Sequence, residues 1–450
     1  MKLLINLQRK KLIINNYEKL FNKSTGAAVR CWYSSNVTEK SNKETKPVLH
    51  KHLHAKIKSC GPIPVAEYMK EALTNPVAGY YMLRDVFGAE GDFITSPEIS
   101  QMFGELVGIW VLNEWRKISK DDFQLVELGP GRGTLSKDIL KVFKQLKAIN
   151  KLSVHLVEVS PALSDIQAKK LCVSSKEVSP ILISGDDKEN KLASYHYREG
   201  VTEDGTKVFW YRSIEHVPRK FSVFIAHEFF DALPIHKFQK NNGAWHEVFV
   251  DIDPNNEEKF RYVMSKFPTL SSKLFISENE QRDHVEASPQ TMVIIDYMSK
   301  FLKECGGFAL IADYGHDGDK TDTFRAFKNH QQQDPLVAPG TADLTADVDF
   351  AMIKKIATKD DRTMAFGPVN QRKFLLDLGI DVRLNVLLQK APDSDRKDLI
   401  SGYKMLIDED KMGKCFKMLA LFPSVLKDHL MMWPVVGFFD RKTENDSRDK

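Results

Sequence analysis

The feature that most limits how this chain can fold is a glycine-rich turn between an apolar strand and a helix. The segment reads Leu125-Val126-Glu127-Leu128-Gly129-Pro130-Gly131-Arg132-Gly133-Thr134-Leu135. Three glycines within five residues let the backbone pass close to a ligand, because a Cβ at such positions would fill that space. The helix that follows offers unpaired N–H groups to the same space. This order of elements predicts an open α/β sheet with a ligand site at the turn.

Short β-type runs alternate with helical runs along much of the chain. We predict strands at 124–128, 154–159, 208–211, 222–226 and 307–312, and helices at 135–146 and 160–171. Such alternation is typical of a parallel sheet with helices on both faces. The predicted fold class is therefore α/β, with a Rossmann-like sheet as its core.

The length of 450 residues indicates more than one structural unit. We expect a leader and linker at 1–46, an N-terminal helical region at 47–120, the sheet unit at 121–340 and a C-terminal helical subdomain at 341–450. Within the sheet unit, about 236–305 is expected to be an insertion with a hairpin around Asn241-Asn242-Gly243. Closing strands are predicted at 418–422 and 435–439.

Two helices are predicted ahead of the sheet. The first covers 63–73. The second begins at Ser96-Pro97-Glu98, which has the form of an N-cap, a first-turn proline and an acid, and apolar residues then follow at helical spacing as far as Trp110. The nearby His50, His52 and His54 have no paired ligand cluster, so we expect a solvated segment and no metal site there.

Charge and composition exclude several classes of protein. Hydrophobic residues make up 42% and charged residues 28%, which is ordinary for a globular chain. No run approaches the roughly 18 to 20 apolar residues of a spanning helix. Outside 1–33 the chain holds 58 basic and 60 acidic residues, so no global field for nucleic acid is expected. The five cysteines lie far apart without a C-x-x-C pair, which argues against metal and disulfide frameworks.

The first 33 residues carry seven Lys or Arg against the single acid Glu18. Basic residues interrupt the apolar ones, as at Arg9-Lys10-Lys11, so the segment lacks the unbroken apolar run that a secretory signal requires. The pattern is typical of a mitochondrial transit peptide, with a disordered basic tail as the alternative. We expect delivery to the mitochondrial matrix and cleavage soon after Arg30.

The glycine turn favours S-adenosylmethionine over a dinucleotide as the cofactor. Its pattern is G-x-G-x-G, with Thr134 and Leu135 where the dinucleotide fingerprint needs its last small residue. Glu127 would repel a pyrophosphate but could organise the ammonium group of a methionine moiety, directly or through water. A dinucleotide oxidoreductase remains the alternative.

Acidic residues follow two further strands. Glu158 ends the second strand, where a carboxylate can accept both hydroxyl protons of a ribose, although it could instead cap the next helix. The expected cofactor-binding residues are Glu127, Gly129, Pro130, Gly131, Gly133, Glu158 and Ser96.

The fourth strand ends in His227-Glu228-Phe229-Phe230-Asp231, at the sheet edge that lines the ligand crevice. We predict Glu228 and Asp231 as the catalytic residues, with Glu228 the stronger candidate. Asp231 could equally cap a turn, and His227 could be a satisfied core histidine.

Longer motifs resemble one family, the MidA-type mitochondrial protein-arginine methyltransferases that act as assembly factors for respiratory complex I. They are G-D-F-I-T-S-P-E-I-S-Q-M-F-G-E at 91–105, E-L-G-P-G-R-G-T-L at 127–135, E-F-F-D-A-L-P at 228–234, A-D-Y-G-H at 312–316 and P-G-T-A-D-L-T-A-D-V-D-F at 339–350. The resemblance implies a class I methyltransferase sheet, S-adenosylmethionine as donor, and an arginine of the 49-kDa-type complex I core subunit as acceptor. The family usually has Asn where this chain has His227, which leaves the role of that position open.

Chemically, Glu228 could hold a protonated guanidinium and orient one nitrogen toward the methyl group, without a metal. The alternative to an enzyme is a methyltransferase-like assembly chaperone that binds its partner without catalytic turnover. Whether the chain forms a homodimer, and how many methyl groups are added, stays open.

Overall fold

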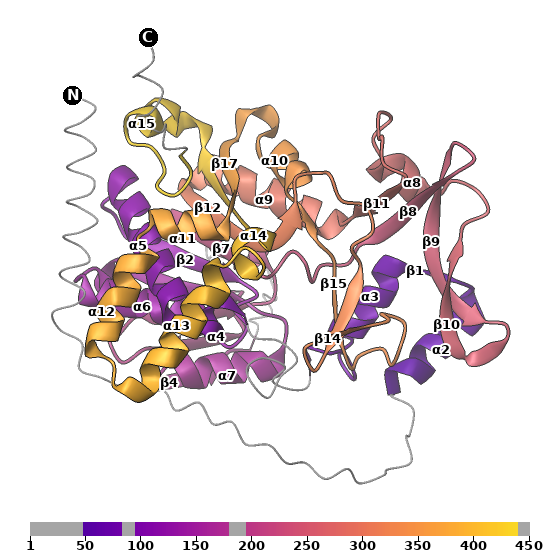
Figure 1. The fold of residues 1–450 in the computed structure, drawn as a ribbon, viewed down its shortest axis with the longest axis horizontal. Coiled ribbons are helices and arrows are strands. Elements are labelled where there is room, and N and C mark those ends of the chain that lie inside the picture. The colour runs from indigo at the N-terminus through magenta and orange to yellow at the C-terminus, as the bar shows by residue number, and fades with distance from the viewer. Residues whose placement is uncertain (1–47, 83–94, 180–194, 440–450) are drawn as a thin grey trace, which may run out of the picture.

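The computed structural model describes residues 48–82, 95–179 and 195–439, and Figure 1 shows how their elements are arranged. The predicted leader and linker, residues 1–46, lie outside the described residues. Within the described ranges, no helix combines the length and the apolar composition that a membrane crossing requires.

A large mixed sheet, the central sheet, forms the core of the molecule. Its order is β17-β18-β12-β7-β2-β3-β6-β5-β4. The five predicted strands are all present and run parallel, which confirms the α/β class. β18 runs antiparallel to β12, and β17 runs antiparallel to β18. The strands are β2 (Phe123–Leu128), β3 (Leu152–Val157), β4 (Ser174–Glu177), β5 (Arg198–Val201), β6 (Lys207–Tyr211), β7 (Ser222–His227), β12 (Gly307–His316), β17 (Thr363–Asn370) and β18 (Phe416–Pro423).

Helices cover both faces of the central sheet because its inner strands are apolar on both sides. Leu125 of β2 and Val223 of β7 belong to one buried cluster, whereas the next residues, Val126 and Phe224, belong to another. The first cluster includes residues of α5 (Gln101–Ile118), α6 (Thr134–Gln145) and α7 (Pro161–Leu171). The second includes residues of α9 (Pro289–Cys305) and α10 (Phe350–Ala357).

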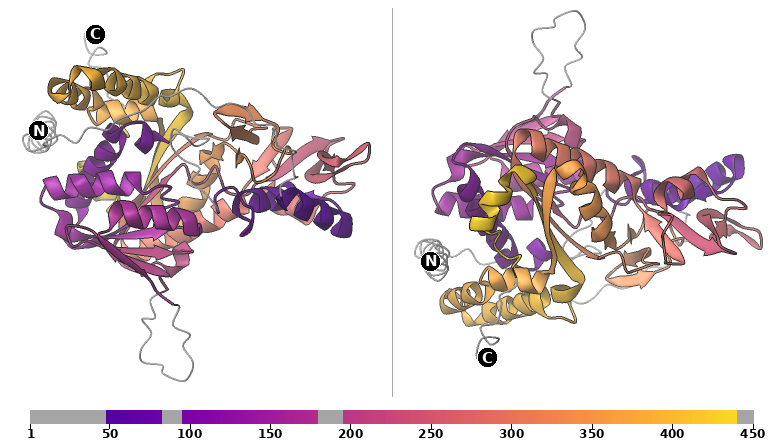
Figure 2. Two further views of the ribbon diagram at one scale, coloured as in Figure 1. Left: turned by 90° about the horizontal axis from the view of Figure 1, so that it is seen from below. Right: turned by 90° about the horizontal axis from the view of Figure 1, so that it is seen from above.

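A second sheet, the added sheet, projects from one end of the molecule together with α2 and α3 (Figure 2). Its order is β1-β9-β8-β11, and β10 pairs with β9. The predicted hairpin is present, since Asn241 pairs with Ala244. α9 packs on the central sheet, so we propose 236–287 as the inserted segment, shorter than the expected 236–305. The elements are α2 (Val48–Cys60), β1 (Ile63–Pro64), α3 (Val65–Thr74), β8 (His236–Asn241), β9 (Ala244–Asp253), β10 (Asn256–Met264), α8 (Leu270–Phe275) and β11 (His284–Ala287).

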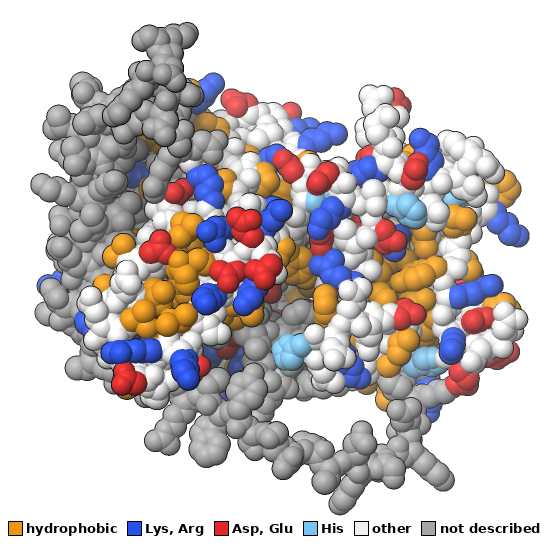
Figure 3. Space-filling view, viewed as in Figure 1, with side chains coloured by type: hydrophobic (Ala, Val, Ile, Leu, Met, Phe, Trp, Pro, Cys, Tyr) orange, Lys and Arg blue, Asp and Glu red, His pale blue; other side chains and the backbone are white. Residues whose placement is uncertain are grey.

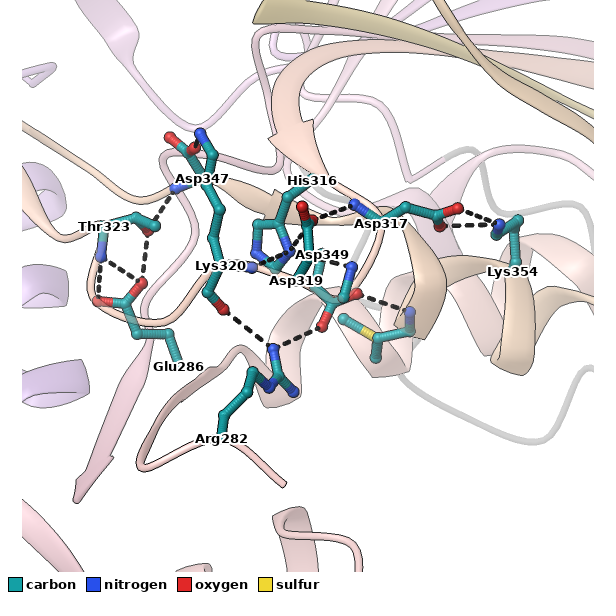
Figure 4. Close-up of polar contacts among 12 residues, drawn as sticks. Arg282, Glu286, His316, Asp317, Asp319, Lys320, Thr323, Asp347, Asp349 and Lys354 are labelled. Atoms are coloured by element: carbon teal, nitrogen blue, oxygen red, sulfur yellow. Dashed lines mark hydrogen bonds and ion pairs between the residues drawn. The ribbon is translucent and has the colours of Figure 1, made fainter. Parts of the chain in front are cut away.

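Polar contacts join the added sheet to the loop that follows β12 (Figure 4). Both carboxylate oxygens of Glu286 accept the backbone N–H of Thr323, at 3.1 and 3.0 Å. Arg282 donates to the carbonyl of Lys320 at 3.1 Å and pairs with Asp349 at 3.8 Å. A three-stranded sheet lies beyond this loop, formed by β13 (Arg325–Lys328), β14 (Gln331–Gln333) and β15 (Asp343–Thr345).

The long helix predicted from Ser96 is in fact two helices. α4 (Ser96–Ile99) ends at Ser100, whose φ of −157° and ψ of 132° are extended, and α5 then begins. The Ser100 side chain accepts the N–H of Met102 at 3.3 Å, so Ser100 caps α5. Thr95 is the N-cap position of α4. The prediction of Ser96 as an N-cap was therefore wrong, because Ser96 is the first residue of α4 and the long helix α5 is capped by Ser100.

Two other local predictions also differ from the structure. His50 lies on α2 and is buried, with its Nε2 3.0 Å from the carbonyl of Glu258, so the solvated reading was wrong for this histidine. Residues 435–439 form no strand, and the carbonyl of Val436 accepts the indole N–H of Trp110 at 3.0 Å.

The C-terminal part contains helices and two strands of the central sheet. The predicted strand at 418–422 is β18, while its neighbour β17 was not predicted. Hydrophobic side chains gather over α12 and α13 in Figure 3, where Val382, Ile400 and Met405 are 52%, 39% and 37% exposed. The helices are α11 (Gln371–Asp377), α12 (Ile380–Lys390), α13 (Asp393–Ile407), α14 (Met412–Cys415) and α15 (Lys427–Met432).

Candidate active site

Two hollows lie at the carboxyl ends of the parallel strands, where ligands bind in open α/β sheets. The main cavity has a volume of about 530 Å³ and is lined by the ends of β2, β3 and β7, together with residues of α3 and α9. A side hollow of about 40 Å³ lies between the glycine turn and the start of α4. Gly129, Gly131 and Glu228 line both spaces. The main cavity is of the size that small-molecule sites usually have.

All three glycines of the turn have a positive φ, which favours glycine. The values are +61° at Gly129, +51° at Gly131 and +77° at Gly133. A Cβ at Gly129 would lie 2.8 Å from the ring of Phe229. Gly133 lines neither hollow and is instead the N-cap position of α6, whereas Pro130 lines the side hollow.

Glu127 is buried at the end of β2 and lines the side hollow. Its carboxyl accepts a hydrogen bond from the Ser136 hydroxyl on α6. Burial raises the pKa of Glu127 to about 7, whereas the hydrogen bond from Ser136 lowers it. An ammonium group beside this carboxyl would favour its ionised form.

Glu158 is buried just after β3 and lines the main cavity. One carboxyl oxygen accepts the N–H of Ser160 at 2.7 Å, and the other accepts Nε2 of Gln167 at 3.0 Å. Burial raises its pKa to about 7. Glu158 thus bonds to the start of α7, as the structural alternative expected, and also faces the cavity.

Gln167 links the glycine turn to Glu158 by hydrogen bonds, and this residue was not predicted from the sequence. Its Nε2 also donates to the carbonyl of Gly131 at 2.7 Å, and its Oε1 accepts the indole N–H of Trp210 at 2.9 Å. The side chain is fully buried. No spacing in the sequence marks it, because a glutamine on a helix that covers a sheet gives no local signal.

Glu228 has a φ of +48°, in the left-handed region that a residue with a Cβ rarely adopts. Its side chain is only 13% exposed, and Oε1 accepts the backbone N–H of Ser96 at 3.3 Å. Burial, and then the nearby charge of Asp231, raise the pKa of Glu228 well above its usual range. Ser96 lines neither hollow and contacts the predicted site through this N–H.

His227 lies at the end of β7 and lines the side hollow. Its Nε2 is 3.4 Å from Oε1 of Glu228 and has no hydrogen-bond partner, while its ring lies 4.9 Å from that of Phe103. Burial lowers its pKa to about 3, so the imidazole is neutral near pH 7.

Asp231 is buried and lines the main cavity. Its Oδ2 accepts the hydroxyl groups of Tyr314 and Thr345, the latter at 2.8 Å. Its Oδ1 is buried without a hydrogen-bond partner. Burial raises the pKa of Asp231. The structure therefore brings Asp231 and Glu228 to one end of one cavity.

The turn that carries both carboxyls is held by Asp313, which had no predicted role. Oδ2 of Asp313 accepts the N–H groups of Phe229, Phe230 and Asp231, at 3.2, 3.0 and 3.4 Å. The N–H of Glu228 donates to the carbonyl of Ala312 at 2.9 Å. The end of β12 thus fixes the backbone after β7. The motif A-D-Y-G-H contains this aspartate, but the motif alone did not indicate its bonds.

Tyr81 and Asp343 complete the acidic end of the main cavity. The Tyr81 hydroxyl donates to Oδ1 of Asp343 at 2.6 Å. Burial raises the pKa of Tyr81 well above its usual range. Neither residue was predicted, since they come from segments more than 250 residues apart.

The residues that line the two hollows fit S-adenosylmethionine. The buried Glu158 carboxyl lies beside apolar Val157 and Ile214 in the main cavity, which suits a ribose next to an adenine ring. Glu127 faces the side hollow next to Gly129, where a methionine ammonium group would find a carboxylate. The positive φ values favour glycine at these positions, and because glycine has no side chain, the path along the turn stays open.

Comparison with known proteins supports this reading. Residues 106–369 match the model of a family described as "Putative S-adenosyl-L-methionine-dependent methyltransferase". The chain is 52% identical over 395 residues to the mitochondrial protein arginine methyltransferase NDUFAF7 homolog of Drosophila melanogaster, covering 87% of this chain and 88% of that protein. It is also 52% identical to the mitochondrial protein arginine methyltransferase NDUFAF7 of Homo sapiens, covering 87% of each.

A solved structure shares the fold. The Burkholderia thailandensis protein crystallised with S-adenosyl-homocysteine superposes with a TM-score of 0.65 at 22% identity, over 84% of this chain and 92% of that one. At this identity the likeness establishes the fold alone, and it confirms the predicted fold class. The assignment to the methyltransferases rests on the family model and the relatives.

Proposed function

Because the chain belongs to the NDUFAF7 family of mitochondrial protein arginine methyltransferases, we propose that Glu228 and Asp231 receive an arginine of a partner protein for methylation by S-adenosylmethionine. The observation that carries this assignment is the group of carboxyls at one end of the main cavity. Glu228, Asp231 and Asp343 all line it. An arginine guanidinium stays protonated, with a pKa above about 12, so a cation enters an acidic space.

Glu228 is proposed to hold the guanidinium by charge-assisted hydrogen bonds. Its pKa is raised by burial and by Asp231, so an empty site favours the protonated carboxyl. An entering cation favours the ionised form instead, and solvent screens the resulting contact only in part, because the Glu228 side chain is 13% exposed. Glu228 can then orient one nitrogen for attack and stabilise charge in the transition state.

The cofactor residues are proposed to be Glu127, Glu158 and the backbone of Gly129 and Gly131. When bound, S-adenosylmethionine supplies a methyl group attached to a positively charged sulfur. Glu158 would hold the ribose hydroxyls while Gln167 fixes its orientation. Holding donor and acceptor in line supplies much of the acceleration.

The partner is proposed to be the 49-kDa-type core subunit of respiratory complex I, methylated in the mitochondrial matrix. This substrate follows from the family resemblance. The mitochondrial names of the relatives support the compartment.

An isolated acceptor subunit tests the function directly. The protein is incubated with radiolabelled S-adenosylmethionine and the 49-kDa-type subunit, and mass spectrometry locates the methylated side chain. We expect label on arginine, and a 100- to 1000-fold slower transfer by Glu228→Gln at saturating donor, comparable to loss of an oxyanion-hole donor. Glu304→Gln is the matched control, since the Glu304 side chain is 62% exposed on α9 and pairs with Arg219 at 2.6 Å, away from the cavity lining.

An assembly chaperone without turnover is the second candidate. The exposed apolar residues Val382, Ile400 and Met405 on α12 and α13 favour it, because a partner subunit could cover them. Stable binding of the subunit with no transferred label would support this candidate and contradict the methyltransferase assignment of Glu228.

A further inference from the structure

We infer that Asp231 accepts the proton that leaves the arginine during methylation, and that Tyr314 and Thr345 position its carboxylate for this step. The inference deepens the proposed function and rests on it. It divides the work between two carboxyls: Glu228 holds the guanidinium, and Asp231 removes one proton.

The chemistry requires such an acceptor. A guanidinium nitrogen forms a bond to the methyl carbon while the bond between that carbon and sulfur breaks, and its electron pair stays on sulfur. The attacking nitrogen then carries one proton too many. Its lone pair is no longer shared with the guanidinium carbon, so this nitrogen is far more acidic than the starting guanidinium. A carboxylate can therefore take the proton, and the product keeps a single positive charge.

The geometry assigns this role to Oδ1 of Asp231. The other oxygen, Oδ2, already accepts the hydroxyl groups of Tyr314 and Thr345. Oδ1 has no partner, although the side chain is only 6% exposed and lines the main cavity. A buried acceptor atom without a donor is unfavourable, so native proteins usually satisfy such atoms. A substrate N–H would satisfy this one.

Glu228 is the weaker candidate for the same step. Its Oε1 accepts the N–H of Ser96, and burial, followed by the charges of Asp231 and Asp343, raises its pKa. Its side chain also reaches the cavity from a backbone held in the left-handed region. These features suit a fixed anchor for the guanidinium.

Groups from several elements set the charge of Asp231. Burial raises the pKa of Asp231, whereas hydrogen bonds from Tyr314 and Thr345, the charge of Arg325 and the backbone N–H of Ala232 lower it. Arg325 is itself paired with Asp347 at 2.7 Å. The titratable and charged groups that face Asp231 are Glu228 and Asp313 at the ends of β7 and β12, Tyr314 on β12, Arg325 on β13, Asp343 on β15 and Tyr81 after α3.

The test measures single-turnover methyl transfer to the isolated 49-kDa-type subunit across a pH range. Asp231→Asn should slow transfer by roughly 100- to 10,000-fold, the usual contribution of a general base, while the dissociation constant of S-adenosylmethionine stays unchanged. Tyr314→Phe and Thr345→Val should move the acid limb of the pH profile to higher pH. Each removes a donor that stabilises the ionised carboxylate, so the base is lost by protonation at a higher pH.

Tyr68→Phe is the matched control. Tyr68 is equally a buried tyrosine, but its hydroxyl donates to the carbonyl of Pro335 at 2.8 Å, outside the cavity lining. The pH profile of the Tyr68→Phe variant should match that of the unaltered protein. Unchanged transfer by Asp231→Asn, or unchanged profiles for both Tyr314→Phe and Thr345→Val, overturns the inference. If the unaltered protein labels no arginine, the proposed function itself fails, so the two failures are distinguishable.

Discussion

Replacing Gln167 by methionine should weaken cofactor binding, although Gln167 itself does not line the main cavity. The methionine side chain has a similar length and shape but neither accepts nor donates the bonds that Gln167 makes. Those bonds reach the Gly131 carbonyl at 2.7 Å, Glu158 at 3.0 Å and the Trp210 indole at 2.9 Å. The change therefore releases the glycine turn and the proposed ribose ligand together.

The magnitude follows from the groups left without partners. The buried Trp210 N–H alone should lower the free energy of unfolding by about 1 to 3 kcal/mol, the cost of an unsatisfied buried donor. Loss of a donor to Glu158 raises the pKa of this carboxyl further, because that bond favours its ionised form. We expect the dissociation constant of S-adenosylmethionine to rise at least about tenfold, equivalent to about 1.4 kcal/mol.

Urea unfolding and titration calorimetry measure the two effects separately. Gln124→Met is the control, because Gln124 is also buried but accepts the Ser222 hydroxyl at 3.0 Å at the opposite end of β2. It should alter stability alone. A folded Gln167→Met protein that binds S-adenosylmethionine as tightly as the unaltered protein would refute the link between Gln167, the turn and Glu158.

Five other outcomes can be checked by binding, transfer and localisation assays. Gly131→Val should abolish S-adenosylmethionine binding, because a φ of +51° strains a β-branched residue beside the cofactor path; normal calorimetric affinity in a folded variant would contradict this. The affinity for S-adenosylmethionine should fall as the pH drops through about 7, because Glu127 and Glu158 become protonated there. Above that pH, Glu158→Ala should lower the binding free energy by about 1.5 to 3 kcal/mol. His227→Asn should keep or raise the transfer rate, since the neutral imidazole makes no hydrogen bond to Glu228; a large loss would give His227 a role. Deleting 1–33 should preserve transfer in vitro yet prevent mitochondrial import, which fractionation of cells expressing the shortened chain would show.

The fold was predictable where a local pattern carries long-range consequences. The five parallel strands follow from alternation of apolar runs with helices, and the glycine turn follows from three residues that tolerate a positive φ. Elements whose partners are distant in the sequence were missed. β17 contains Gly367 and Pro368, which weaken a strand pattern, yet β18 pairs with it.

The residues of the candidate site that the sequence indicated lie at the end of a strand or within a few residues after it. Glu158 and Glu228 lie there, because carboxyl ends of parallel strands share one edge of the sheet. Gln167, Asp313 and Asp343 act across 9 to 262 residues of chain, through bonds that no local spacing encodes. Their contribution is visible only in three dimensions.

The contacts of Asp313 also bear on the order in which the protein matures during synthesis. Asp313 is 84 residues from Phe229 in the turn it holds, and strands β8, β9, β10 and β11 of the added sheet lie between them in the sequence. A nascent chain that has emerged only as far as Phe230 can form the glycine turn and β7, but the acceptor carboxyls lack their anchor until β12 docks beside β7. Donor-binding capacity should therefore precede acceptor-binding capacity as the chain leaves the ribosome, so an incomplete chain would hold the methyl donor without a formed place for a substrate.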